Sequence, residues 1–132
     1  AGNASGFYRS VPNRRNNLAA GGTLEMLAVK GQMQADLWKE LPVGSSYPVE
    51  WVNIDFPDPD LEGGAASVAA QGRAKGAAYF NRLEGIYLSE DGRSVYFLST
   101  SGGYPDDATR GFGQLWHYIP ADEKFNGEDR LV

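Results

Sequence analysis

The chain has 132 residues, of which 42% are hydrophobic and 22% are charged, enough for one domain with a core. The net charge of −5 argues against nucleic-acid binding, which requires a basic face. The absence of cysteine excludes disulfides, thiolate zinc sites and cysteine nucleophiles. No apolar run approaches the length of a transmembrane span. The 17 glycines and 7 prolines favour short strands and turns over long helices.

The N-terminal residues predict a hairpin. Residues 1–6 are small and polar, and we expect them to fray. Residues 7–11 alternate as a strand that stops at Pro12, and residues 23–29 form a second strand. Residues 13–22 are rich in Asn, Arg and Gly, so the hairpin is expected to have a long loop.

The middle of the chain predicts one strand, one turn and one helix. Residues 36–40 are expected to form a turn or a short helical segment, and residues 49–54 are expected to form a strand. The acidic segment 55–60 contains two prolines and lacks the alternating ligands and the glycine of an EF-hand loop, so we expect a solvated turn. Residues 65–78 are rich in alanine and predict a helix interrupted by glycine.

The C-terminal third predicts a meander of strands. Asp91-Gly92 is a strong hairpin signal between two of them. Loops are expected over residues 100–112 and 121–129. The strands are expected over residues 85–88, 94–99, 113–119 and 130–132.

Residues 7–12 and 115–120 share one pattern, a strand that ends in proline and is followed by a polar loop. Such repetition is typical of a β-propeller. We therefore predict an all-β, mainly antiparallel fold, a partial β-propeller of roughly one and a half blades with one short helical insertion. Residues 82–132 would form one blade, residues 1–31 the outer hairpin of another, and residues 32–81 a crossover with the helix. The chain is then expected to be a fragment of a larger propeller.

Arg82 and Glu84 are the candidate site residues. They are two positions apart at the start of a predicted strand, so both side chains should project to the same face. Gly85 lets the backbone pass close to a neighbour. A guanidinium beside a carboxylate suits either a structural ion pair, which is the commoner arrangement, or a site that holds an oxyanion together with a hard cation. His117, the only histidine, is interpreted as a half-exposed strand residue rather than as a base.

Several segments resemble the PhoX family of bacterial alkaline phosphatases. They cover nearly the whole chain in the right order, and Arg-Leu-Glu-Gly is the most specific part. The segments are residues 21–24, 50–59, 76–85 (GAAYFNRLEG), 95–103 (VYFLSTSGG) and 111–118 (GFGQLWHY).

The resemblance implies a six-bladed propeller, export by a twin-arginine signal to the periplasm or beyond, and hydrolysis of a small phosphorylated substrate. It also implies a calcium–iron cluster in which Glu84 is a metal ligand and Arg82 a phosphate contact. The family's cluster includes a cysteine and further carboxylates from other blades, none of which is assignable here. No catalytic residue is therefore assigned, and the fragment alone is expected to be inactive. These residues contain no recognisable export signal.

Two other functions stay open at this point. A calcium-dependent propeller lactonase also presents a carboxylate to calcium from an inner strand, and a propeller can be a non-enzymatic scaffold. A partial propeller leaves blade faces uncovered and strand edges unpaired, so we also expect self-association.

Overall fold

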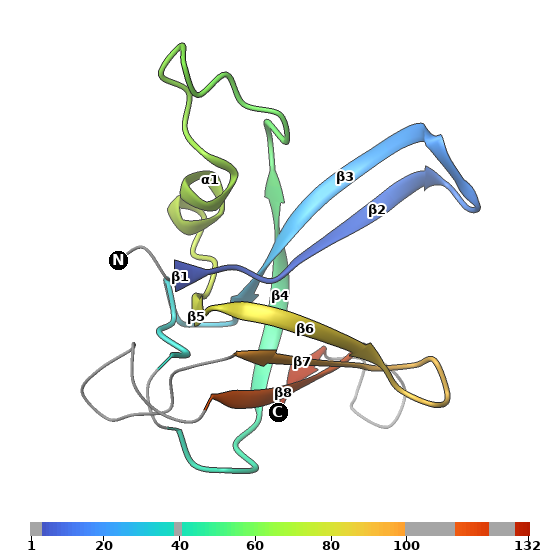
Figure 1. Ribbon diagram of the computed structural model, residues 1–132, viewed down its shortest axis with the longest axis vertical. Coiled ribbons are helices and arrows are strands. Elements are labelled where there is room, and N and C mark those ends of the chain that lie inside the picture. Colours follow the sequence, from blue (N-terminus) through green and yellow to red (C-terminus); the bar gives the residue numbers. More distant parts are fainter. Residues whose placement is uncertain (1–3, 39–40, 100–112, 122–128) are drawn as a thin grey trace.

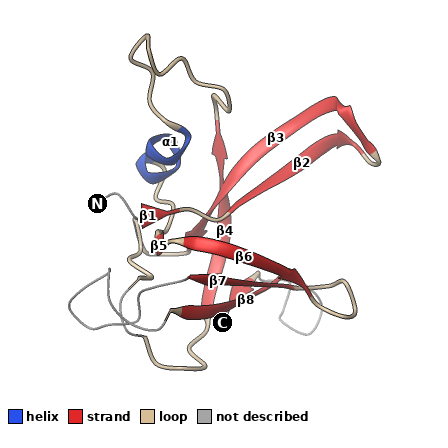
Figure 2. Cartoon of the chain, viewed as in Figure 1, coloured by secondary structure: helices blue, strands red, loops and turns tan. Residues whose placement is uncertain are grey.

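The computed structural model describes residues 4–38, 41–99, 113–121 and 129–132 (Figure 1). Seven of the described strands build one antiparallel sheet in the order β2-β3-β4-β9-β8-β7-β6, and β1 and β5 pair separately. The sheet curls into a half-barrel (Figure 2). The prediction of a mainly antiparallel all-β fold with one short helical insertion is confirmed. The elements are β1 (Ala4–Ser5), β2 (Tyr8–Arg14), β3 (Asn17–Val29), β4 (Tyr47–Ile54), α1 (Val68–Ala74), β5 (Phe80–Asn81), β6 (Leu83–Leu88), β7 (Val95–Ser99), β8 (Gln114–Ile119) and β9 (Arg130–Leu131).

The hairpin of β2 and β3 is longer and tighter than the sequence predicts. Its pairing continues to Arg14↔Asn17, so the long loop expected over residues 13–22 is wrong. Asn16 in the turn has a φ of 60°, a left-handed conformation that asparagine tolerates. Pro12 lies inside β2 instead of ending it, because β2 is an edge strand and a missing N–H is tolerated there.

β4 joins the two halves of the sheet. It pairs with β3 on one side and with β9 on the other, so the N-terminal hairpin and the C-terminal strands belong to one sheet. Residues 32–81, expected to cross between blades, therefore contribute a strand to that sheet. The predicted meander of β6, β7, β8 and β9 is present, and the Asp91-Gly92 turn connects its first two strands. The loops predicted over 100–112 and most of 121–129 lie outside the described residues.

Helix α1 is shorter than the predicted range 65–78. Ser67 caps its N-terminus, where the Ser67 hydroxyl oxygen accepts a hydrogen bond of 3.1 Å from the Ala70 N–H. The helix ends before Gly76, whose φ of 96° is incompatible with a continued helix. Gly72 is buried, and a Cβ at this position would overlap Met26 of β3. The helix therefore lies directly on the sheet through a position without a side chain.

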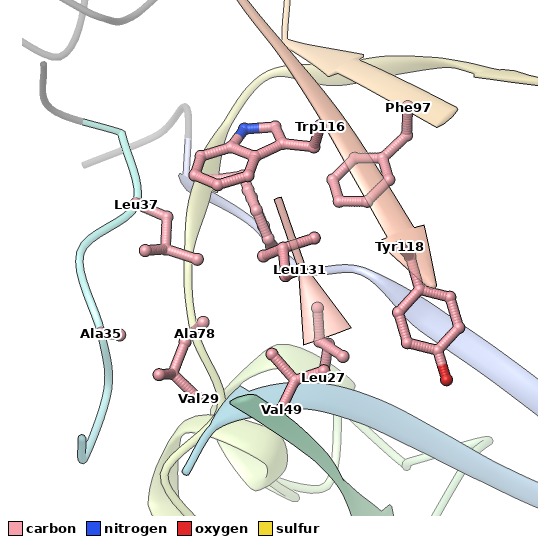
Figure 3. Close-up of a cluster of buried hydrophobic side chains, with 11 residues drawn as sticks. Leu27, Val29, Ala35, Leu37, Val49, Ala78, Phe97, Trp116, Tyr118 and Leu131 are labelled. Carbon is pink, nitrogen blue, oxygen red and sulfur yellow. The ribbon is translucent and has the colours of Figure 1, made fainter. Parts of the chain in front are cut away.

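The main core lies on the inner face of the sheet (Figure 3). Phe80 is completely buried there, with its ring edge-on to Phe97 at 5.2 Å and to Trp116 at 5.5 Å. This contact anchors the short strand β5 over β7 and β8. Seven labelled side chains of the cluster come from β3, β4, β7, β8 and β9: Leu27, Val29, Val49, Phe97, Trp116, Tyr118 and Leu131.

Candidate functional site

The segment around Arg82 has an irregular backbone. Arg82 lies between β5 and β6 with a left-handed φ of 48°, which is uncommon for a residue other than glycine. The pairing of β6 with β7 then shifts between Leu83 and Gly85, so Glu84 is the extra residue of a β-bulge. Bulges and left-handed residues re-aim side chains, and they concentrate at functional sites.

Both flanks of this segment are fixed by the fold. Phe80 of β5 is anchored in the core, and it pairs with Ser5 of β1. The Ser5 hydroxyl oxygen accepts a hydrogen bond of 3.3 Å from the Leu83 N–H. The expectation that residues 1–6 fray is therefore wrong for Ala4 and Ser5, whose pairing supports the site.

Arg82 and Glu84 project together, as the sequence predicts. Arg82 Nη2 donates a hydrogen bond of 3.1 Å to Glu84 Oε1. The two side chains are 52% and 51% exposed, and an exposed ion pair contributes only about 0.2–1 kcal/mol to stability. Their meeting depends on the left-handed residue and the bulge, not on the regular strand alternation assumed from the sequence. The pair is thus positioned by the backbone and adds little to stability.

Two buried polar side chains flank the ion pair in the fold. Asn81 directly precedes Arg82, and Ser99 pairs with Leu83 across β6 and β7. Each is 2% exposed, and within the described structure neither side chain has a hydrogen-bond partner. An unsatisfied buried polar group costs about 1–3 kcal/mol, so such groups require an explanation. Sequence reasoning missed both residues; the one available signal was an asparagine interrupting the apolar run before Arg82.

Gly85 follows the bulge and permits the close approach expected of it. A Cβ at this position would lie 3.0 Å from Leu98 Cδ2 of the neighbouring strand β7. Leu98 is 41% exposed, so the end of its side chain could shift to make room for a small substituent. Gly85 therefore lies against the Leu98 side chain of β7, directly after the bulge.

The acidic turn over residues 55–60 makes local contacts. Lys75 Nζ lies 3.0 Å from Asp55 Oδ2, and the hydrogen bond from Lys75 is the main cause that lowers the pKa of the Asp55 carboxyl. Asp60 Oδ1 accepts a hydrogen bond of 2.9 Å from the Gly63 N–H. Among the described residues, no three His, Asp or Glu side chains gather in a group able to hold a metal ion. The prediction that this segment is a turn is confirmed.

His117 lies half-buried in β8, as predicted. Its Nε2 is 2.8 Å from the Ser94 Oγ, and its ring stacks on Tyr96 at 4.0 Å. Burial lowers the pKa of His117 below its usual value. These contacts arise from the pairing of β7 with β8 and were not visible in the sequence. They place His117 on the outer face of the sheet.

The comparisons with known proteins give one positive result. The family model of alkaline phosphatase PhoX matches residues 2–130. Neither the curated proteins nor the solved structures contain a significant match. No helix in the described part of the chain is long and apolar enough to cross a membrane. Since the match covers nearly the whole chain and includes the Arg-Leu-Glu-Gly segment, the chain belongs to the PhoX alkaline phosphatase family.

Proposed function

We propose that this chain supplies part of the active site of a PhoX-like phosphomonoesterase, with Arg82 contacting phosphate and Glu84 binding a metal ion. The observation that carries the proposal is the Arg82–Glu84 pair, 3.1 Å apart and half-exposed. A left-handed residue and a bulge position this pair. Its segment lies within the residues that the family model matches.

The chemistry of the two side chains suits this reaction. Cleavage of a phosphate ester builds negative charge on the phosphoryl oxygens, and catalysis requires groups that neutralise it. The planar guanidinium of Arg82 can donate two parallel hydrogen bonds to such oxygens. The Glu84 carboxylate is an acceptor-only ligand of the kind that hard cations prefer. Bound calcium and iron would add charge neutralisation and an activated water.

The described residues do not complete a calcium–iron cluster. They provide Glu84 without two further His, Asp or Glu side chains beside it, and the chain has no cysteine. Within the described structure, Asn81 Oδ1 and Ser99 Oγ are buried without a hydrogen-bond partner, which is compatible with a nearby cation or an ordered water. We infer that the remaining ligands come from other residues of a longer propeller in the periplasm or outside the cell. The 132-residue chain alone should not hydrolyse phosphomonoesters.

An activity assay on two classes of substrate, a phosphomonoester and a lactone, tests this proposal. The natural polypeptide that carries this chain would be assayed on p-nitrophenyl phosphate and on a lactone, with calcium and with a chelator. We expect phosphate release that depends on metal and no lactone opening. Calcium-dependent lactone opening would instead support a lactonase, and inactivity of the metal-loaded protein on both substrates would support a non-enzymatic scaffold. Either of these results would overturn the proposal.

A further inference from the structure

The backbone conformation of Arg82 depends on support from its surroundings. Its left-handed φ of 48° is unfavourable for any residue that carries a Cβ. Such a conformation persists only where neighbouring structure holds it in place. One residue that is distant in the sequence, Ser5, contacts the chain on both sides of Arg82.

Ser5 reaches the residues before and after Arg82 by two different contacts. In the pairing of β1 with β5, Ser5 lies opposite Phe80, two residues before Arg82 (Figure 1). The Ser5 hydroxyl oxygen accepts the hydrogen bond of 3.3 Å from the Leu83 N–H, one residue after Arg82. The Leu83 side chain also packs against the main core. Ser5 therefore bridges the two flanks of the left-handed residue.

The segment that carries Ser5 is itself fixed to the sheet. Two residues further on, the Phe7 ring stacks on the Phe97 ring of β7, with the ring centres 4.1 Å apart. The Phe7 carbonyl oxygen accepts a hydrogen bond of 2.8 Å from the Leu27 N–H of β3. Phe97 and Leu27 are 2% and 0% exposed, so both anchors lie in the core. The Ser5 hydroxyl is thus held at a defined position beside Leu83.

The hydroxyl of Ser5 has a role that the strand pairing does not share. The pairing of β1 with β5 is a contact between backbones, so a different residue at position 5 can retain it. The bond to the Leu83 N–H requires a side-chain oxygen at that position. Without this oxygen, the partly buried Leu83 N–H loses its acceptor, and the chain is held less firmly where it leaves Arg82. An alanine at position 5 therefore separates the two roles.

We propose that Ser5 is a positioning residue of the candidate site. It holds the left-handed backbone of Arg82 through Leu83, and it thereby aims the Arg82 guanidinium. A guanidinium that must meet phosphate oxygens with two parallel hydrogen bonds is sensitive to the direction in which its backbone presents it. The effect of Ser5 on catalysis rests on the proposed function, whereas its effect on the backbone does not.

Amide hydrogen exchange, measured by NMR on this chain, tests the effect on the backbone. Ser5→Ala should speed exchange at Leu83 about fivefold relative to exchange at His117, because it removes one hydrogen bond. The His117 N–H donates to the Val132 carbonyl oxygen at 2.9 Å, and its exchange reports any general loss of stability. Ser5→Thr retains a hydroxyl and should recover most of the protection at Leu83.

Ser67→Ala is the matched control for this exchange measurement. The Ser67 hydroxyl oxygen also accepts a hydrogen bond from a backbone N–H, that of Ala70 at 3.1 Å, but it lies at helix α1. Its loss should leave the ratio of Leu83 exchange to His117 exchange unchanged. An unchanged ratio in Ser5→Ala, or an equal increase in Ser67→Ala, would overturn the proposal. The melting temperature shows that each variant is folded.

Hydrolysis of p-nitrophenyl phosphate by the natural polypeptide that carries this chain tests the link to the site. Ser5→Ala should lower kcat/KM about fivefold, Ser5→Thr should recover most of this loss, and Ser67→Ala should have no effect. In an Arg82→Lys background, Ser5→Ala should change kcat/KM by less than about twofold, because the guanidinium that Ser5 aims is absent.

The two measurements separate the failure of this inference from the failure of the proposed function. Equal losses of kcat/KM from Ser5→Ala in the wild-type and Arg82→Lys backgrounds would overturn the positioning role. Inactivity of the wild-type polypeptide would overturn the proposed function, and the exchange ratio at Leu83 would then still decide whether Ser5 holds the backbone.

Discussion

Replacing Gly72 by alanine should destabilise the fold although it improves the helix. Alanine is favoured over glycine in a helix interior by about 1 kcal/mol. The new Cβ, however, would overlap Met26 Sδ and lie 3.3 Å from Ile54 Cδ1. Met26 and Ile54 are 0% and 2% exposed, so neither side chain can move into solvent. Overpacking of a core costs about 1–3 kcal/mol, so we expect a net loss of roughly 1 kcal/mol.

Urea unfolding at low protein concentration measures this change. Ala70→Gly is the control for helix propensity, since Ala70 is exposed on the same helix; it should cost about 1 kcal/mol without any packing term. Combined with Met26→Ala, the same Gly72→Ala change should become stabilising, because the overlap is gone. A more stable Gly72→Ala single variant would refute the close contact of α1 with β3.

Three further predictions concern the core and the site. Phe80→Ala should lower the free energy of unfolding by about 3–5 kcal/mol, because this completely buried ring anchors β5; a loss below 1 kcal/mol would contradict that role. Tyr118→Phe should cost about 1–2 kcal/mol, since the hydroxyl donates to Asp129 at 2.8 Å and accepts from Trp51 at 3.1 Å. Burial raises the pKa of Tyr118 to about 12, so wild-type stability should fall between pH 10 and 12 and fall less in Tyr118→Phe; equal slopes in pH-dependent denaturation would contradict this. Glu84→Gln should change the free energy of unfolding in urea by less than about 1 kcal/mol, because the ion pair is exposed. A larger loss would indicate that the Arg82–Glu84 pair serves mainly to stabilise the fold.

Local signals in the sequence were sufficient for the C-terminal meander. The Asp91-Gly92 turn is closed within its own residues, where the Ser89 N–H donates to the Ser94 carbonyl oxygen at 2.9 Å. Turn chemistry of this kind can be read from neighbouring residues alone. The strand around β4 was likewise predictable from its alternating apolar residues.

Features that depend on distant segments could not be predicted. Pro12 continues β2 only because that strand has a free edge, and the edge is defined by the whole sheet. The pairing of β4 with β9 joins residues far apart in the chain. The bulge at Glu84 could not be predicted from the sequence, because a bulge is a shift in the pairing register of β6 against β7.

The candidate site was only partly visible in the sequence. Arg82 and Glu84 were found from their residue types and spacing, and the structure brings them together. Asn81 and Ser99 were missed, because their significance lies in burial without a partner, which only the fold reveals. Sequence alone therefore identified the charged groups and not their surroundings.

Steady-state hydrolysis of a phosphomonoester by the natural polypeptide tests the role of Arg82 most directly. The comparison is Arg82→Lys against Arg9→Lys, since Arg9 forms a similar ion pair with Glu25 at 2.8 Å on the N-terminal hairpin. Loss of a charge-assisted hydrogen bond is worth about 1.5–3 kcal/mol. Arg82→Lys should therefore lower kcat/KM by roughly 10- to 150-fold, and Arg9→Lys should leave it unchanged. Equal kcat/KM values for Arg82→Lys and wild type would contradict the assignment of Arg82 as the phosphate contact.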